Sequence, residues 1–103
     1  MTNMIKEESI KQIQQERRAN YKKYLLKHPD KYNQVIEENA LPLILAAESF
    51  EKAKTEKSKT KYKLALINEI DIFKDFIADI DPESKYNATK MMLEYIARIE
   101  RTL

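Results

Sequence analysis

Few residues of this chain combine the types and spacing that catalysis or metal binding requires. The one histidine, His28, directly precedes Pro29 and is expected to cap a helix end or face solvent, since an imidazolium is favoured near the carbonyl-rich C-terminus of a helix. The serines (Ser9, Ser49, Ser58 and Ser84) have no base and no glycine elbow nearby in the sequence. The chain contains no cysteine and no glycine, which excludes thiol chemistry and glycine-lined phosphate loops. The sequence therefore predicts a protein that is not an enzyme and uses no cofactor or metal.

Two acidic clusters are the remaining candidates for cation binding. Residues 79–83 read Asp-Ile-Asp-Pro-Glu, which has the acidity of a calcium loop but lacks the glycine that forms its turn. Asp71, Asp75 and Asp79 recur every four residues and would share one helix face. Helix capping explains the first cluster and a solvated helix face explains the second, so both are interpreted as structural.

The periodicity of apolar residues is helical almost throughout, and no stretch alternates like a strand. The sequence predicts an all-α fold, a small antiparallel bundle of about four helices in a single domain over residues 1–103. The expected helices cover about residues 3–28, a segment from Tyr32 to Lys54 that is kinked or broken at Pro42, residues 60–80, and a last helix that runs to residue 103. Asp81 is expected to be the N-cap of that last helix, and residues 54–61 are expected to form a polar loop.

Charge is arranged in blocks of alternating sign. The net charge of the 103 residues is +2, with local values of +4 over residues 1–28, −3 over 29–50, +4 over 51–63, −5 over 64–83 and +2 over 84–103. Alternating blocks favour antiparallel helices that attract their neighbours, whereas a nucleic-acid-binding protein more often has one dominant basic face. No apolar run is long enough for a membrane span and no signal peptide precedes the helices, so a cytoplasmic location is expected.

Helical periodicity also predicts which faces are buried. The arc expected in the core over residues 60–80 contains Tyr62, Ala65, Leu66, Ile70, Ile72, Phe73, Phe76, Ile77 and Ile80. The last helix is expected to bury a stripe of Ala88, Met91, Met92, Tyr95, Ile99 and Leu103. A second apolar strip on that helix, made of Tyr86, Leu93 and Ala97, is either an interface or a further buried face of the bundle.

The N-terminal helix is poor in apolar residues and rich in basic ones. Its stripe of Ile10, Ile13, Arg17, Tyr21 and Tyr24 is surrounded by lysine and arginine. Because arginine and tyrosine are enriched in interface hot spots, the predicted partner-binding residues are Arg17, Arg18, Tyr21, Lys22, Lys23 and Tyr24. Two alternatives stay open: the tyrosines cover the bundle on a solvated face, or the basic side chains contact nucleic-acid phosphates.

Two charged residues fall among apolar positions. Glu69 lies inside the arc of residues 60–80, and Arg17 lies inside the N-terminal stripe. A buried charge requires a partner or a route to water. Glu69 would therefore pair with Arg17 or with Arg98, or the side chains would reach solvent past a thin core.

These features favour a small intracellular binding protein, an inhibitor, adaptor or regulatory factor that contacts another protein through its basic, tyrosine-bearing helix. The frequent use of lysine, isoleucine and asparagine is typical of a low-GC bacterium, its phage or a mobile element. One alternative is a nucleic-acid-associated regulator that uses the N-terminal helix and residues 52–63. Another is a bacteriocin-immunity-type helical bundle, which rests on size and helical layout alone. A homodimer would supplement a thin core, and the sequence leaves the oligomeric state open.

Overall fold

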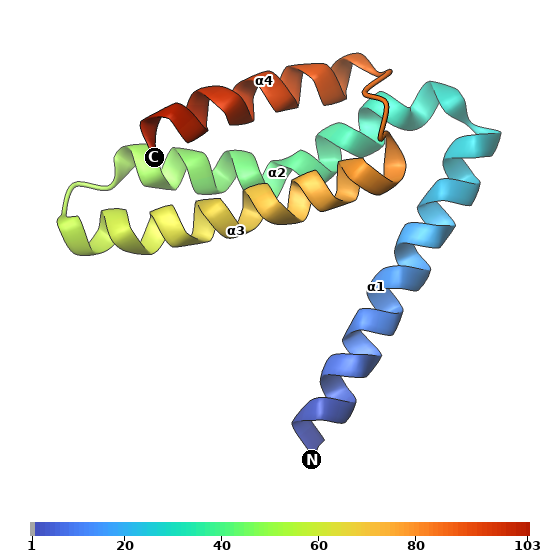
Figure 1. The fold of residues 1–103 in the computed structure, drawn as a ribbon, viewed down its shortest axis with the longest axis horizontal. Helices are drawn as coiled ribbons and strands as arrows, with labels where there is room; N and C mark the ends of the chain where they lie inside the picture. Colours follow the sequence, from blue (N-terminus) through green and yellow to red (C-terminus); the bar gives the residue numbers. More distant parts are fainter. Residues whose placement is uncertain (1) are drawn as a thin grey trace. The chain divides into compact units, whose positions relative to one another are not determined.

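The computed structural model describes the backbone of residues 2–103 and the side chains of residues 12, 13 and 15–103. The elements are α1 (Thr2–Lys27), a short 3-10 helix η1 (Pro29–Lys31), α2 (Tyr32–Lys52), α3 (Glu56–Ile80) and α4 (Asn87–Thr102). No strand occurs between residues 2 and 103. The prediction of an all-α fold with four helices is confirmed (Figure 1).

The chain divides into two compact units, Met1–Tyr32 and Asn33–Leu103. The first consists of α1 and η1, and the second contains α2, α3 and α4. The sequence-based expectation of one domain over residues 1–103 stays a prediction.

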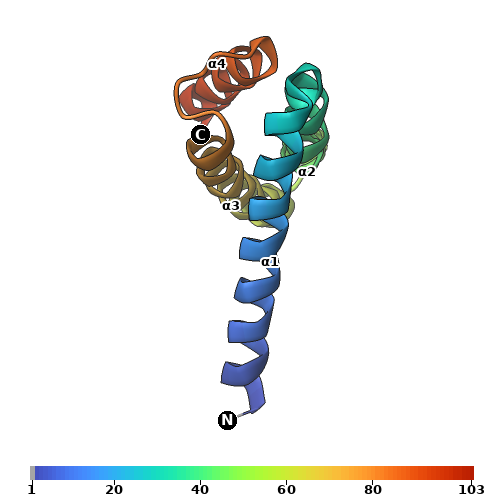
Figure 2. The ribbon, with the colours of Figure 1, turned by 90° about the vertical axis from the view of Figure 1, so that its right-hand side faces the viewer.

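In the second unit, α2, α3 and α4 lie alongside one another, as a view nearly along their axes shows (Figure 2). The core residues of this unit come from all three helices: Val35, Ile36, Ala40, Leu43 and Ala47 from α2, Leu66, Ile70, Phe73, Phe76, Ile77 and Ile80 from α3, and Ala88 and Ile96 from α4. The rings of Phe73 and Phe76 lie with their centroids 6.4 Å apart. Burial of such faces supplies most of the stability of a small helical bundle.

Helix α2 continues through Pro42, so the break that the sequence allowed at this residue is absent. Proline has no amide hydrogen and cannot donate to the carbonyl of Glu38, one turn earlier. Both Pro42 and Glu38 are exposed, so the freed carbonyl lies where water can bind it. Packing of the apolar residues on either side of Pro42 keeps the two halves in one helix.

The loop between α2 and α3 is much shorter than the sequence predicted. Only Ala53–Thr55 separate the two helices, and most of the predicted loop over residues 54–61 belongs to α3. Thr55 is the N-cap of α3, since its Oγ1 accepts a hydrogen bond of 3.1 Å from the amide of Ser58. The prediction was wrong because a lack of apolar residues indicates exposure to solvent, whereas a good N-cap is sufficient to begin a helix at Glu56.

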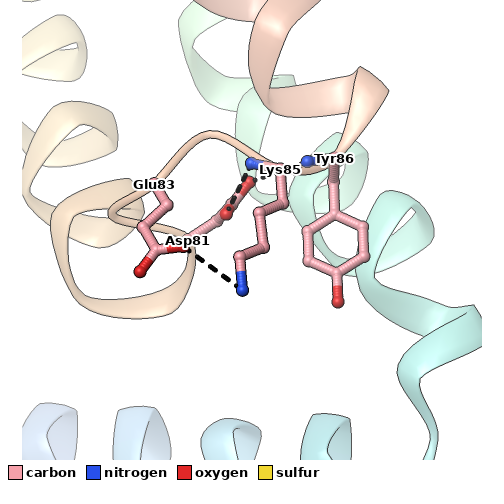
Figure 3. Close-up of polar contacts among 4 residues, drawn as sticks. All are labelled: Asp81, Glu83, Lys85 and Tyr86. Atoms are coloured by element: carbon pink, nitrogen blue, oxygen red, sulfur yellow. Dashed lines mark hydrogen bonds and ion pairs between the residues drawn. The ribbon is translucent and has the colours of Figure 1, made fainter.

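The connection from α3 to α4 also differs from the prediction. Asp81 is the C-cap of α3, and α4 begins only at Asn87 with Tyr86 as its N-cap. The buried carboxylate of Asp81 accepts hydrogen bonds from the amides of Lys85 at 3.0 Å and Tyr86 at 3.2 Å (Figure 3). Within this loop Ser84 has a φ of 53°, the left-handed conformation. The carboxylate therefore organises the loop before α4, where sequence reasoning made it the cap of a helix.

Contacts between distant residues fix α4 against its neighbours. The amide of Ala88 donates a 2.9 Å hydrogen bond to Oδ1 of Asn33 in the first turn of α2. Helix α2 thereby satisfies one of the amides that a helix N-terminus leaves without an intrahelical partner. Lys74 of α3 forms an exposed ion pair of 2.9 Å with Glu100 of α4.

The predicted core is confirmed in part. Of the expected core residues, Ala65 is exposed, Ile72 is 52% exposed and Met91 is 68% exposed, so placing them in the interior was wrong. Ile96 and Thr89 are fully buried on α4, and neither belonged to a predicted stripe. The apolar arc of a helix wheel is wider than the strip that neighbouring helices can cover, so residues at its edge remain exposed.

None of the helices in the part of the chain that the structure describes is long and apolar enough to span a membrane.

Replacing Asp81 with alanine is expected to destabilise the protein by about 2–3 kcal/mol, because the amides of Lys85 and Tyr86 lose a charged acceptor in a half-buried loop. Urea unfolding followed by circular dichroism measures this change. Glu83→Ala is the matched control: it removes an exposed carboxylate of the same loop that pairs with Lys85, and its cost should stay below about 1 kcal/mol. Equal costs for the two variants would contradict a structural role for Asp81.

Limited proteolysis distinguishes the short α2–α3 connection from the longer predicted loop. Trypsin should cut residues 33–103 first after Lys52 or Lys54, which flank the non-helical residues 53–55. Lys57, Lys59 and Lys61 lie inside α3 and should be cut later. Mass spectrometry of the earliest fragments gives the order, and first cleavage after Lys59 or Lys61 would favour the longer loop.

Candidate functional site

Helix α1 carries the residues that the sequence singled out for partner binding. It ends where the amide of His28 donates to the carbonyls of Tyr24 at 2.9 Å and Leu25 at 3.2 Å. Pro29 then begins η1, since proline disfavours helix at the preceding residue and is well suited to a first helical position. The side chains of Ile10 and the other residues up to 11 lie outside the described part, as does that of Gln14.

Four described residues form what we call the tyrosine face of α1: Ile13, Arg17, Tyr21 and Tyr24. Their spacing places them on one side of the helix. Ile13 is 48% exposed, Tyr21 38% and Tyr24 45%. The centroid of the Tyr24 ring lies 4.8 Å from that of the His28 ring, which is about one turn further along the same face. An isoleucine and two phenol rings are therefore available on one helix surface.

The tyrosine face is hollowed rather than flat. Arg17, Asn20, Tyr21 and Tyr24 line an open depression of about 540 Å³. Asn20 was not among the residues predicted from the sequence, because its short polar side chain lies at the edge of the stripe. Leu25 is fully buried and was also missed, since it lies on another side of α1.

The predicted partner-binding residues do not all share one face. Arg17, Tyr21 and Tyr24 lie together, whereas the helical period turns Arg18 and Lys22 toward one flank and Lys23 toward the other. Arg18 is half-buried, and the other five are exposed. Arg18 and Lys22 each take part in an interaction with other groups of the protein. The structure thus provides an aromatic face with basic residues on both flanks.

The sequence pattern places Arg17 among apolar residues, but the structure shows that its side chain is exposed. Arg17 is exposed and Glu69 is half-buried, so each side chain has a route to water. Arg98, the other partner considered for Glu69, is exposed as well. The argument that a buried charge must find a partner therefore does not apply to Arg17.

The second predicted strip does not form a continuous exposed surface. Tyr86 and Leu93 are half-buried, whereas Ala97 is exposed. Ala97 lines a shallow depression of about 310 Å³ together with Glu94, Arg98 and Arg101. A role for this strip as an interface stays a prediction.

The acidic row of α3 is not arranged as a metal site. Asp71 and Asp75 are exposed and Asp79 is half-buried, and Asp75 and Asp79 each have an interaction partner in the protein. Among the described side chains, no three or more histidine, aspartate or glutamate residues are placed to hold a metal ion.

Two ionisable groups outside α1, on Tyr95 and Lys85, have raised pKa values. Partial burial raises the pKa of the Tyr95 phenol, and the nearby carboxylates of Glu51 and Glu48 on α2 raise it further. The hydrogen bond and ion pair with Glu83 raise the pKa of the Lys85 ammonium. Neither group lies near the tyrosine face in sequence.

The Tyr95 phenol is expected to titrate above its ordinary pKa, and Glu51→Gln should lower that pKa by removing one negative neighbour. The pKa of the Tyr95 phenol is higher in the folded protein than in the unfolded chain. The contribution of this group to the free energy of unfolding is therefore complete at pH values below its unfolded pKa, near 10. It is lost as the pH rises toward the folded pKa. Tyrosine-selective ¹³C NMR measures the titration, and a Tyr95 pKa that Glu51→Gln leaves unchanged would contradict the assignment.

Known proteins give no guide to what this arrangement binds. No protein-family model, curated protein or solved structure matches the chain. The exposure, charge and chemistry of the residues described above are what indicate a function.

Proposed function

We propose that this protein is a non-enzymatic binding protein that docks the tyrosine face of α1 onto an acidic surface of another protein. The observation that carries the proposal is the exposure of Tyr21 (38%) and Tyr24 (45%) beside the exposed Arg17. Tyrosine and arginine are the residues that most often dominate the free energy of a protein–protein interface. Inhibitor, adaptor and regulatory roles are all consistent with such a surface.

The chemistry of these side chains favours a protein partner. A phenol ring contributes apolar area and a hydroxyl that hydrogen-bonds, and it loses little conformational entropy when it is immobilised. Ile13 adds apolar area about two turns before Tyr21, and Asn20 adds an amide at the edge. The open depression between Arg17 and Tyr24 is suited to a side chain that projects from the partner.

Charge complementarity indicates an acidic partner. Between Arg17 and Lys27 the helix has five basic residues and no acidic one. Such a charge accelerates association with a negatively charged surface and slows approach to a positive one. The tyrosine face would then supply the short-range contacts that determine the lifetime of the complex.

Nucleic acid is the second candidate, because the same five basic residues could neutralise phosphates. The positions of the basic residues disfavour this alternative. Arg18 and Lys23 lie on opposite flanks of the helix, so they cannot both contact the phosphates of one strand that lies against a single face of α1. Binding to nucleic acid would weaken steeply as salt is added and would depend little on Ile13.

Site-specific crosslinking tests the proposal. A photo-crosslinking amino acid at Tyr24 should capture a protein from a lysate of the source organism. The same group at Leu26, which is 76% exposed on the opposite side of α1, should not. Equal capture at both positions would contradict docking through the tyrosine face.

Affinity for the captured protein, once purified, gives the quantitative test. The double variant Tyr21→Ala, Tyr24→Ala should lower affinity by roughly tenfold or more, mainly through faster dissociation, whereas Leu26→Ala should change it by less than about twofold. Reversal of Arg18, Lys22 and Lys23 to glutamate should mainly slow association. Unchanged affinity in the tyrosine variant, or preferential binding of nucleic acid, would overturn the proposal.

A further inference from the structure

We propose that the lysine-rich end of the second unit, where α2 turns into α3, binds the surface of an anionic lipid membrane. This inference is independent of the function proposed for α1, because it rests on different residues. The turn lies at the opposite end of α3 from the loop that contains Asp81 (Figure 1). Residues 51–63 contain six lysines and two glutamates and have a net charge of +4.

The positive charge at this end is accessible. Lys52, Lys54, Lys57, Lys59 and Lys61 are exposed, and Lys63 is half-buried with its Nζ donating to the Leu103 carbonyl at 3.1 Å. Glu83 and Glu100 pair with other lysines, Lys85 and Lys74. A cluster of four to eight lysines near a membrane is attracted to anionic lipids such as phosphatidylserine and phosphoinositides.

The turn also has a depression in which a headgroup can be held. Its lining residues are mostly basic or hydroxyl-bearing: Ser49, Lys52, Ala53, Lys54, Thr55, Ser58 and Tyr62. The depression is open and has a volume of about 460 Å³. The Thr55 hydroxyl already donates to Oγ of Ser58 at 2.8 Å. The ammonium groups and the other lining hydroxyls are therefore the donors suited to phosphate and carboxylate oxygens.

An exposed leucine beside the lysines distinguishes a membrane from other anionic partners. Lys57, Lys61 and Leu64 follow one another at intervals of four and three residues and share the outer face of α3. Leu64 is 64% exposed and Ile67 is 39% exposed. Basic residues combined with leucine on one helix face are typical of segments that lie in the membrane interface.

Nucleic acid is the less favoured partner of this surface. An exposed leucine gains nothing from a phosphate backbone, and residues 51–63 contain no arginine, the residue that most often reads bases. Tyr62 is half-buried, and the Lys61 Nζ lies 5.8 Å from its ring centroid, so the ring is not freely available for base stacking.

The remainder of the α3 face determines how the contact is made. After Leu64 the same side of α3 carries Asp71 and Asp75, both exposed. These carboxylates are repelled by an anionic surface, so only the first turns of α3 can approach it. The end of the unit would therefore contact the headgroups, with Leu64 reaching the interface.

Vesicle sedimentation with the full chain tests this inference. The protein should bind vesicles of phosphatidylcholine with about 30 mol% phosphatidylserine at low salt, should not bind pure phosphatidylcholine, and should be released as salt increases. Lys57→Glu with Lys61→Glu should lower the partition coefficient roughly tenfold or more. Lys57 lies in the first turn of α3, where glutamate is favourable, and Lys61 is exposed, so this variant is expected to keep its fold, as circular dichroism will verify.

A matched pair controls for net charge. Lys85→Glu with Lys90→Glu changes the total charge equally at exposed positions far from the turn and should lower binding by less than about threefold. Leu64→Ser should weaken binding severalfold and leave its salt dependence unchanged. The inference is overturned if anionic vesicles are not bound, if both lysine pairs lower binding equally, if Leu64→Ser has no effect, or if the turn binds DNA and not vesicles.

Discussion

The carboxylate of Asp81 determines where the chain reverses between α3 and α4, and the geometry of the second unit depends on that reversal. Asp81 ends α3, accepts the amides of Lys85 and Tyr86, and is itself buried. Beyond this loop, Oδ1 of Asn33 accepts a hydrogen bond from the amide of Ala88, which places the start of α4 beside the start of α2. Burial of Ile96 and Ala88 in the shared interior follows from this placement. A single polar side chain thus helps to direct the packing of an amphipathic helix.

The two proposed surfaces differ in how they combine charge with apolar area. On α1 the exposed rings of Tyr21 and Tyr24 lie between basic flanks, a combination that favours short-range contacts with a protein. At the α2–α3 turn the charge comes from lysines alone and the apolar group is Leu64. Lysine keeps a strongly hydrated point charge and adds little directional specificity, which is suited to a diffuse anionic surface. If both proposals hold, the protein would bring its partner to a membrane.

The α2–α3 turn also shows how a polar sequence can be misread. Residues 54–61 contain lysine, glutamate, serine and threonine and no apolar side chain, which is typical of a loop. In the structure Thr55 caps α3, and residues 56–61 form its first turns, which are exposed except at the half-buried Ser58. The error matters for function, because a helix presents Lys57, Lys61 and Leu64 on one face and a loop would not.

The sequence by itself determined the all-α class, the number of helices, the end of α1 before Pro29 and most of the α3 core, because these depend on local periodicity and on the geometry of proline. It also identified Arg17, Tyr21 and Tyr24 as one face, which requires only the helical repeat. Tertiary structure decided the burial of Ile96 and Thr89, the exposure of Ile72 and Met91, and the continuity of α2 through Pro42. The role of Asp81 depends on hydrogen bonds to amides four and five residues further along the chain, and only the structure showed them. These features depend on which neighbouring helix covers a given side chain and on where backbone amides find acceptors. Neither kind of contact leaves a periodic signal in the sequence.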